Sequence, residues 1–296
     1  MRENNTAPIW GILVSMCIFG TIGIVRKYID ISSSLLSLSR AVIGTLFLLA
    51  ITFRRPIRFH AIRHQLPLLA ISGAAIGFNW IFLFEAYRCT TVTTATLCYY
   101  TAPSFVVIAS HFILKEQLTF KKSICAVVAL VGMVLISGIL NDHSAGSSEI
   151  YGVLFGLGAA VLYASVIILN RFIKVSDPAH RTIFQLGLGA IVLLPYTILT
   201  DNWSGMQFAP LPLMLILVLG VVHTGFAYML YFGAVSKLPA QTAAILSYID
   251  PLLAIILSAL ILKEPMGFNE ITGTALIIGA ALVSELSLPL KTKSHT

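Results

Sequence analysis

A stretch of 44 residues occurs twice in this chain: residues 77–120 align without a gap with residues 225–268, 148 positions later. Fifteen of the 44 aligned pairs are identical, and they include Pro103 with Pro251. The run Ile-Leu-Lys-Glu that ends at Glu116 recurs in the same register. Apolar composition raises the number of chance matches, but it does not place a proline and a Lys-Glu pair at equal spacing. The chain is therefore predicted to consist of two copies of one unit.

The composition indicates that this unit lies in a membrane. Hydrophobic residues make up 57% of the chain and charged residues only 10%, with a mean hydropathy of +0.92, whereas soluble proteins are about a quarter charged. A bilayer core about 30 Å thick is crossed by a helix of about 20 apolar residues. The predicted fold class is an all-α integral membrane protein with ten transmembrane helices. They are expected at residues 8–28, 34–53, 66–87, 92–114, 123–140, 150–173, 182–200, 211–232, 240–262 and 268–288.

The basic residues predict the orientation of these spans. An even number of spans places both termini on one side, and fourteen Lys and Arg residues fall on that side against four on the other, with Arg40 inside the second span. Positive charge gathers on the cytoplasmic side of membrane proteins. The protein is therefore predicted to be multi-pass in the cell (inner) membrane with both termini cytoplasmic. Because this topology accounts for the net charge of +7, no nucleic-acid partner is expected.

Five spans per copy is an odd number, so the second copy enters the membrane from the opposite face. The predicted domains are two inverted repeats at residues 8–140 and 150–288, joined by a polar linker at residues 141–149. Secondary transporters often have this plan, with a substrate site near the midplane where broken helices meet. A small-molecule substrate and the lipid bilayer are thus the expected partners.

Two prolines are predicted to break helices near the midplane. Pro103 falls near the centre of the fourth span and Pro251 near the centre of the ninth. A proline lacks the backbone N–H and clashes with the preceding turn, so it frees carbonyl groups. Freed backbone at membrane depth is tolerated where it is buried in protein or lines a watery cavity. The two prolines are therefore candidate helix-break hinges, and the alternative is that they form packing kinks.

Asp250, directly before Pro251, is the main candidate for substrate chemistry. An aspartate at the bilayer centre costs roughly 3 kcal/mol on insertion scales, and ionisable groups at that depth are functional by default. It is predicted to carry a proton or to pair with a substrate cation. The alternative is that it accepts local backbone hydrogen bonds at the kink. Its counterpart in the first copy, Ala102, carries no charge, so the site is expected to be asymmetric.

Two other polar groups within the spans are candidates. His223 lies in the middle of the eighth span, where it could act in a proton relay or remain neutral and bond to a neighbouring helix. Arg40, a turn or two inside the second span, could reach the outer interface or point inward to hold a carboxylate bidentately. An offset of 145 pairs Arg40 with Gln185 in the seventh span.

Aromatic residues cluster in the third, fourth, eighth and ninth spans. Trp80, Tyr99, Tyr100 and Tyr248 lie too deep for the interfacial belts that Trp and Tyr form. With Asn79 and Gln241 they could build a pocket that offers stacking, cation–π contacts and a few hydrogen bonds. The alternative for each of them is packing between helices.

Enzyme chemistry is not expected. The sequence contains no H-E-x-x-H, no G-x-S-x-G and no phosphate-binding loop. Its four cysteines have no metal-binding spacing and lie in or beside apolar spans. No cofactor and no metal are therefore predicted, and an intramembrane enzyme or sensor is a remote alternative.

The repeated stretch resembles a known family. YYTAPSFVVIASHFILKEQLT (residues 99–119) resembles the fourth-helix motif of EamA-type transporters in the drug/metabolite transporter superfamily, and SYIDPLLAIILSALILKEP (residues 247–265) resembles the second-repeat version. The resemblance covers essentially the whole chain. It implies two EamA-like repeats and a central cavity lined mainly by the third, fourth, eighth and ninth helices, with the fifth and tenth as scaffold. It also implies alternating access, often in exchange for protons.

The expected function is that of a secondary active transporter. An exporter of amino acids or related small metabolites is predicted, with protons as the candidate coupling ion. The alternative is an uptake carrier for a cationic or quaternary-amine solute held by Asp250 and the aromatic residues. A monomer and a homodimer are both compatible with the sequence.

Overall fold

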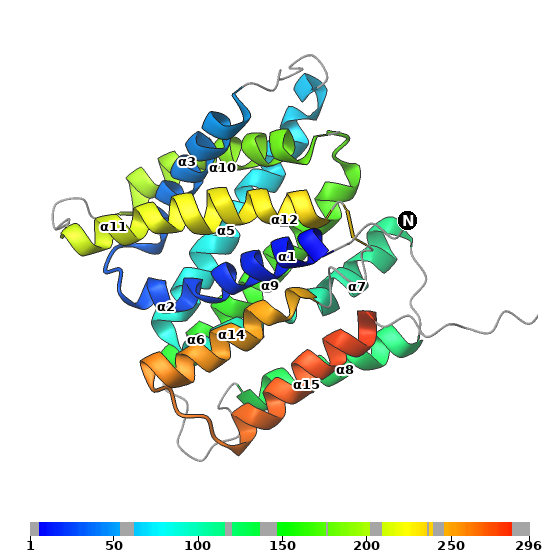
Figure 1. Cartoon of the computed structure of the whole chain (residues 1–296). Helices are drawn as coiled ribbons and strands as arrows, with labels where there is room; N and C mark the ends of the chain where they lie inside the picture. Colours follow the sequence, from blue (N-terminus) through cyan, green and yellow to red (C-terminus); the bar gives the residue numbers. More distant parts are fainter. Residues whose placement is uncertain are drawn as a thin grey trace, which may run out of the picture.

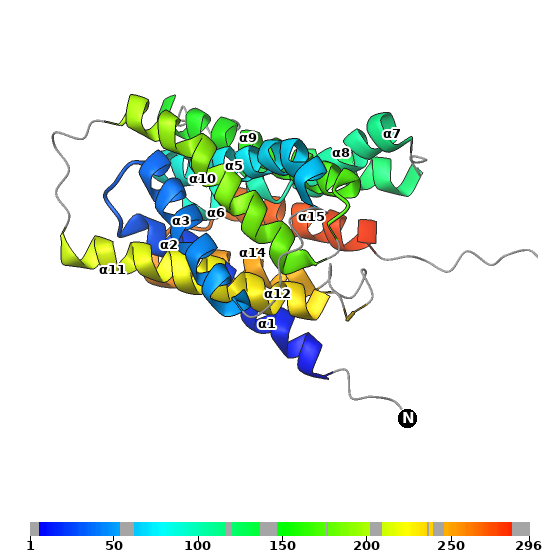
Figure 2. The ribbon, with the colours of Figure 1, turned by 90° about the horizontal axis from the view of Figure 1, so that it is seen from above.

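The computed structural model describes residues 6–53, 62–115, 120–136, 147–175, 177–201, 209–235, 237–238 and 246–285. Every regular element in these residues is a helix (Figures 1 and 2). The predicted all-α class is thus confirmed. The ends of the predicted domains and most of the predicted linker lie outside the described residues.

The first half of the described chain contains a short helical turn, η1, and seven helices. They are α1 (Thr6–Gly20), α2 (Ile22–Lys27), α3 (Ser33–Thr52), η1 (Arg63–Gln65), α5 (Leu66–Cys89), α6 (Val92–Tyr99), α7 (Ala102–Leu114) and α8 (Phe120–Ile136).

The second half contains six α-helices and two π-helical segments, η3 and η4. They are α9 (Ser147–Phe172), α10 (Pro178–Thr200), α11 (Pro210–Val218), η3 (Leu219–Phe226), α12 (Ala227–Val235), α14 (Ile249–Leu257), η4 (Ser258–Leu262) and α15 (Phe268–Glu285). Helix α9 begins inside the predicted linker. In Figure 1, α11 and α12 form one continuous rod through η3.

Seven helical segments are long and apolar enough to cross a membrane. They are Ala7–Lys27, Ser33–Thr52, Arg63–Cys89, Val92–Leu114, Ser147–Phe172, Ala179–Thr200 and Pro210–Tyr231. Three shorter apolar helices, Ser123–Leu135, Ile249–Leu262 and Phe268–Val283, fall on the fifth, ninth and tenth predicted spans. The described residues therefore form a multi-spanning membrane protein, and the count of ten crossings remains a prediction.

Helix α5 is packed closely against α10 and α9. A β-carbon added at Gly73 would lie 2.1 Å from the carbonyl oxygen of Gln185, and one at Gly189 would lie 2.6 Å from the carbonyl oxygen of Gly73. Only glycine allows two backbones to approach this far, which is a common way to pack membrane helices. Seen from above, α5, α9 and α8 lie on one side of the molecule and α1, α12 and α14 on the other (Figure 2).

Helices α8 and α15 form a pair at one edge of the molecule (Figure 1). Their backbones come close at Gly132, where an added β-carbon would lie 2.8 Å from the carbonyl oxygen of Gly273. These are the fifth and tenth predicted spans, for which the family resemblance implies a scaffold role.

Three helices are interrupted inside the molecule. Helix α6 ends at Tyr99 and α7 begins at Ala102, so the fourth predicted span breaks directly before Pro103. The ninth predicted span is interrupted at the turn residue Tyr248, and Pro251 lies in the first turn of α14, where its missing N–H costs no hydrogen bond within α14. The first predicted span is also interrupted, at Thr21 between α1 and α2, without any proline. This third break was not predicted.

The repeated Ile-Leu-Lys-Glu motif ends a helix in the same way in both copies. Lys115 after α7 has φ 56° and ψ 28°, and Lys263 after η4 has φ 54° and ψ 33°. They are the non-glycine residues with positive φ in the described part of the chain. A left-handed residue at this position is a standard helix stop, so the motif works as a shared termination signal.

Candidate substrate-binding site

Asp250 lies where three interrupted helices meet. It occupies the first turn of α14, is half-buried, and its Oδ2 accepts a hydrogen bond from the Tyr100 hydroxyl group. Tyr100 itself lies in the break between α6 and α7. A β-carbon added at Gly20, the last residue of α1, would lie 2.8 Å from the Asp250 carbonyl oxygen. Residues of the first half of the chain thus contact both the carboxylate and the backbone of Asp250.

Aromatic rings continue from this carboxylate into the molecule. The Tyr99 and Tyr100 ring centroids are 5.7 Å apart, and Tyr99 lies 5.4 Å from Tyr163 of α9. Tyr163 keeps 40% of its surface exposed despite this contact. On α12, Tyr228 lies 5.6 Å from Phe19 of α1. These rings offer stacking surfaces and hydroxyl groups of the kind that line ligand pockets.

Arg40 lies inside the protein and does not reach an outer interface. Its side chain is 2% exposed, and its Cζ lies 4.2 Å from the centroid of the Trp80 ring. Its Nε donates a hydrogen bond of 2.6 Å to Oγ1 of Thr224. Arg40 therefore points inward and lies beside Trp80, while its binding of a carboxylate stays a prediction.

His223 and Thr224 owe their positions to the π-helical segment η3. The Thr224 hydroxyl donates to the Leu219 carbonyl at 3.0 Å, and Nδ1 of His223 lies 3.3 Å from the Val218 carbonyl, each five residues back. Nε2 of His223 lies 2.8 Å from Oγ1 of Thr21, in the break between α1 and α2. His223 is thus bonded to a neighbouring helix, and π-helical turns are frequent at functional sites.

Two of the predicted site residues have packing partners. The Asn79 amide nitrogen donates to the Ala159 carbonyl at 2.6 Å and so ties α5 to α9. Tyr248, which directly precedes α14, is buried in a cluster with Leu97 and Ile277. Gln241, the other polar residue of the predicted pocket, lies outside the described residues.

Sequence reasoning missed Thr21, Thr224 and Tyr163. Thr21 follows Gly20 in the middle of an apolar run, and this small-polar pair is a weak signal for a helix break. Thr224 adjoins His223, but its role depends on the π-helical geometry, which has no simple sequence signature. Tyr163 lies between the apolar residues Leu162 and Ala164 of the sixth predicted span, so only the fold could identify it.

Glu264 of the repeated motif forms a network at the start of α6. Its Oε1 accepts from the Val92 backbone N–H at 2.8 Å, and its Oε2 accepts from the Thr93 N–H at 3.2 Å and from the Ser258 hydroxyl. Nearby, Nζ of Lys27 donates to the Thr90 carbonyl at 3.0 Å. The first residues of α6 are therefore hydrogen-bonded to the second half of the chain. Glu116, the counterpart of Glu264, lies outside the described residues.

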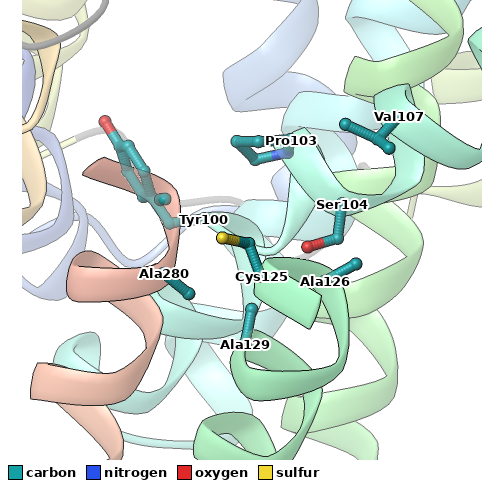
Figure 3. A pocket seen from close by; sticks show the side chains of 9 residues that line it. Tyr100, Pro103, Ser104, Val107, Cys125, Ala126, Ala129 and Ala280 are labelled. Atoms are coloured by element: carbon teal, nitrogen blue, oxygen red, sulfur yellow. The ribbon is translucent and has the colours of Figure 1, made fainter. Parts of the chain in front are cut away.

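A small pocket opens behind the break in the fourth span (Figure 3). Its volume is about 280 Å³ with its open side included. Tyr100, Pro103 and Ser104 face the short side chains of α8 and α15 across it, and the Tyr100 hydroxyl points away from the other lining side chains. The pocket thus adjoins the scaffold pair and not the Asp250 carboxylate.

Metal binding finds no support in the described part of the chain, where no group of three or more His, Cys, Asp and Glu side chains lies together. The described cysteines are free: Cys17, Cys89, Cys98 and Cys125.

The broken helices, the buried polar groups and the apolar spans together define a helical membrane protein with a polar interior. The model of the EamA-like transporter family matches residues 6–138 and again residues 150–285. The chain belongs to the EamA-like transporter family. Because this is a family of transporters, the predictions of family and of a non-enzymatic role are confirmed.

Proteins named as transporters in two other organisms are similar to this chain. The chain is 30% identical over 267 residues to a Bacillus subtilis protein named "Uncharacterized transporter YxxF", covering 86% of this chain and 82% of that protein. It is 25% identical over 277 residues to an uncharacterized transporter of Archaeoglobus fulgidus, covering 92% and 94%. A solved crystal structure with 19% identity superposes with a TM-score of 0.67 over 95% of this chain and 96% of that one, which supports the fold.

Proposed function

We propose that this transporter exports amino acids or related small metabolites by alternating access, coupled to protons. One observation carries the proposal: the Tyr100 hydroxyl from the first half of the chain bonds the Asp250 carboxylate from the second half, where interrupted helices meet. A carboxylate at this depth binds a proton or a substrate ammonium group. Binding of a proton or of an ammonium group would change the Tyr100–Asp250 hydrogen bond between the two halves. Binding would thereby be coupled to the relative motion of the halves.

The proposed site surrounds this carboxylate. Tyr99 and Tyr100 supply stacking and hydroxyl groups, Trp80 lies beside the buried Arg40, and His223 connects η3 to the α1–α2 break. Asn79 and Tyr248 support the walls through their packing contacts. Pro103 and Pro251 would be the hinges about which α7 and α14 tilt.

The topology of the proposal is that of two inverted five-helix repeats. Ten spans and the excess of Lys and Arg on one side favour cytoplasmic termini in the cell (inner) membrane. Alternating access then consists of rocking of one repeat against the other around the central site. The partners in this proposal are a small-molecule substrate, protons and the lipid bilayer, for a monomer or homodimer.

A cation-uptake carrier is the alternative that the aromatic rings near Asp250 would also suit. Arg40 opposes it, because a buried guanidinium group raises the cost of bringing a second permanent cation into the same interior. Competition by quaternary amines and inward flux at a normal membrane potential would favour this alternative.

Asp250→Asn tests the proposal. In proteoliposomes that carry a pH gradient, purified protein is expected to move at least one radiolabelled amino acid, and Asp250→Asn is expected to abolish the gradient-driven part. Glu85→Gln is the matched control, because Glu85 forms an exposed pair with Arg88 at 3.0 Å. Unchanged gradient-driven flux in Asp250→Asn would overturn the proposed role of the carboxylate.

A further inference from the structure

Arg40 is a buried cation without a carboxylate partner. In the part of the chain that the structure describes, the ion pairs join Arg88 to Glu85 and His180 to Asp177, and none includes Arg40. Taking an unpaired charge out of water is costly, and the cost falls when a counter-charge arrives. The guanidinium group of this buried residue therefore needs an anion that the described chain does not provide.

The guanidinium group is held in a fixed orientation. One face packs on the Trp80 ring, 4.2 Å from Cζ to the ring centroid, and Nε donates to Thr224 at 2.6 Å. The Thr224 hydroxyl in turn donates to the Leu219 carbonyl at 3.0 Å, so the acceptor is held as well. Nη1 and Nη2 donate no hydrogen bond to any described residue. The two terminal nitrogens match the fork of donors that binds a carboxylate bidentately.

Gln185, the counterpart of Arg40 in the second repeat, has a purely structural role. Gln185 of α10 donates to the Ser72 hydroxyl at 2.7 Å and to the Asn170 side-chain oxygen at 2.8 Å. Its amide nitrogen thus uses both protons to tie three helices together. Arg40 is anchored through one nitrogen only, and its remaining donors are left over for another molecule.

A chain of contacts links Arg40 to the backbone of Asp250. Arg40 bonds Thr224, the neighbouring His223 bonds Thr21, and the adjacent Gly20 packs on the Asp250 backbone. Among the described residues, this chain of contacts joins one buried cation, Arg40, to one acid, Asp250. A ligand with one negative charge, or with one charge of each sign, suits this pair, whereas a phosphate dianion would bring excess negative charge toward Asp250.

We propose that Arg40 is the anion-binding residue of the substrate site and that the transported molecule carries a carboxylate group. This inference rests on the proposed transport function and adds the chemical class of the substrate to it. In this arrangement the carboxylate bonds Nη1 and Nη2, while an ammonium group of the same molecule, where present, faces Asp250.

Ligand pairs test the proposal without any mutation. The full chain, purified in detergent, is heated with each of the twenty protein amino acids and separately with the corresponding carboxamide, which keeps the ammonium group but loses the negative charge. A ligand that binds the native state raises the unfolding midpoint. At least one amino acid is expected to raise it while its carboxamide does not. Equal shifts for acid and amide, or no shift with any amino acid, would overturn the proposal.

Two variants assign the effect to Arg40. Arg40→Gln is expected to weaken the apparent affinity for the amino acid at least tenfold, about what losing one charge-assisted hydrogen bond predicts. Arg40→Lys keeps the charge, is the safer variant for folding, and is expected to lose most of the discrimination between acid and amide because it lacks the fork. Arg88→Gln, which removes an exposed positive charge, is the control and should leave discrimination unchanged.

The outcomes separate this inference from the proposed function. If both Arg40 variants still prefer the acid to its amide, Arg40 is not the anion-binding residue. If pH-driven flux of an amine or amide depends on Asp250 while carboxylates are ignored, transport holds and the carboxylate class is wrong. If no solute moves in wild-type proteoliposomes, the proposed function itself fails.

Discussion

The carboxylate of Glu264 in the second half of the chain caps α6 in the first half, accepting the Val92 N–H at 2.8 Å. The first N–H groups of a helix have no partner within the helix and carry partial positive charge. A carboxylate is therefore well suited to this position. Because α6 leads directly to Tyr99 and Tyr100, the cap fixes the helix that brings the aromatic residues to Asp250.

Glu264→Gln is expected to destabilise the protein by about 1 kcal/mol, because the neutral amide loses the charge interaction with the helix end and one of its two acceptor oxygens. The measurement is the midpoint of unfolding in detergent. Glu85→Gln serves as control, since an exposed ion pair on one helix, such as that with Arg88, contributes only about 0.3–0.5 kcal/mol. Equal losses in the two variants would contradict a specific capping role for Glu264.

Gly73→Ala is expected to lower stability strongly. The added methyl group would lie 2.1 Å from the Gln185 carbonyl oxygen, a backbone atom that moves only if α5 and α10 separate. Overpacking of this kind costs roughly 1–3 kcal/mol or more. Gly279→Ala is the matched control, because nothing lies within 4 Å of a β-carbon at that position of α15. It should be neutral or slightly stabilising, and a loss as large as that of Gly73→Ala would contradict the close α5–α10 packing.

Tyr100→Phe is expected to reduce substrate flux roughly tenfold while leaving the fold intact. The variant keeps the ring that contacts Tyr99 but removes the hydroxyl that donates to Asp250, and a hydrogen bond to a charged group contributes about 1.5–3 kcal/mol. Flux in proteoliposomes measures the effect. Tyr151→Phe, at an exposed position near the start of α9, is the control. Wild-type flux in Tyr100→Phe would show that the bond across the two halves does not matter for transport.

Family and helical class could be predicted because they depend on patterns that repeat along the chain. The matched Pro103 and Pro251 and the recurring Lys-Glu pair mark equivalent helices whatever their partners are. The family match over both halves confirmed the assignment. The number of spans is harder to predict, because three of the ten apolar segments form shorter helices.

The site could be predicted only where one residue carries its own signal. A charge such as Asp250 or Arg40 is visible in an apolar run, but its partner is not. Tyr100 is 150 residues from Asp250, and Thr21 is 202 residues from His223. The break at Thr21 lies beside the packing of Gly20 against the Asp250 backbone, a tertiary contact that local propensity cannot encode. Asn79 is another example. The sequence shows that it is polar, but not that its amide nitrogen donates a hydrogen bond to the Ala159 carbonyl.

The π-helical segment η3 makes the length of the eighth predicted span as important as its composition. A π-helical turn holds about one residue more than an α-helical turn. Deleting one residue within Leu219–Phe226 would let the segment relax to an α-helix, which would leave the helices on either side of it in nearly the same orientation. Tyr228 could then keep its place 5.6 Å from Phe19, but His223 and Thr224 would lose the positions that the five-residue spacing gives them. A related chain one residue shorter in this segment would therefore have to bond Thr21 and Arg40 through different side chains.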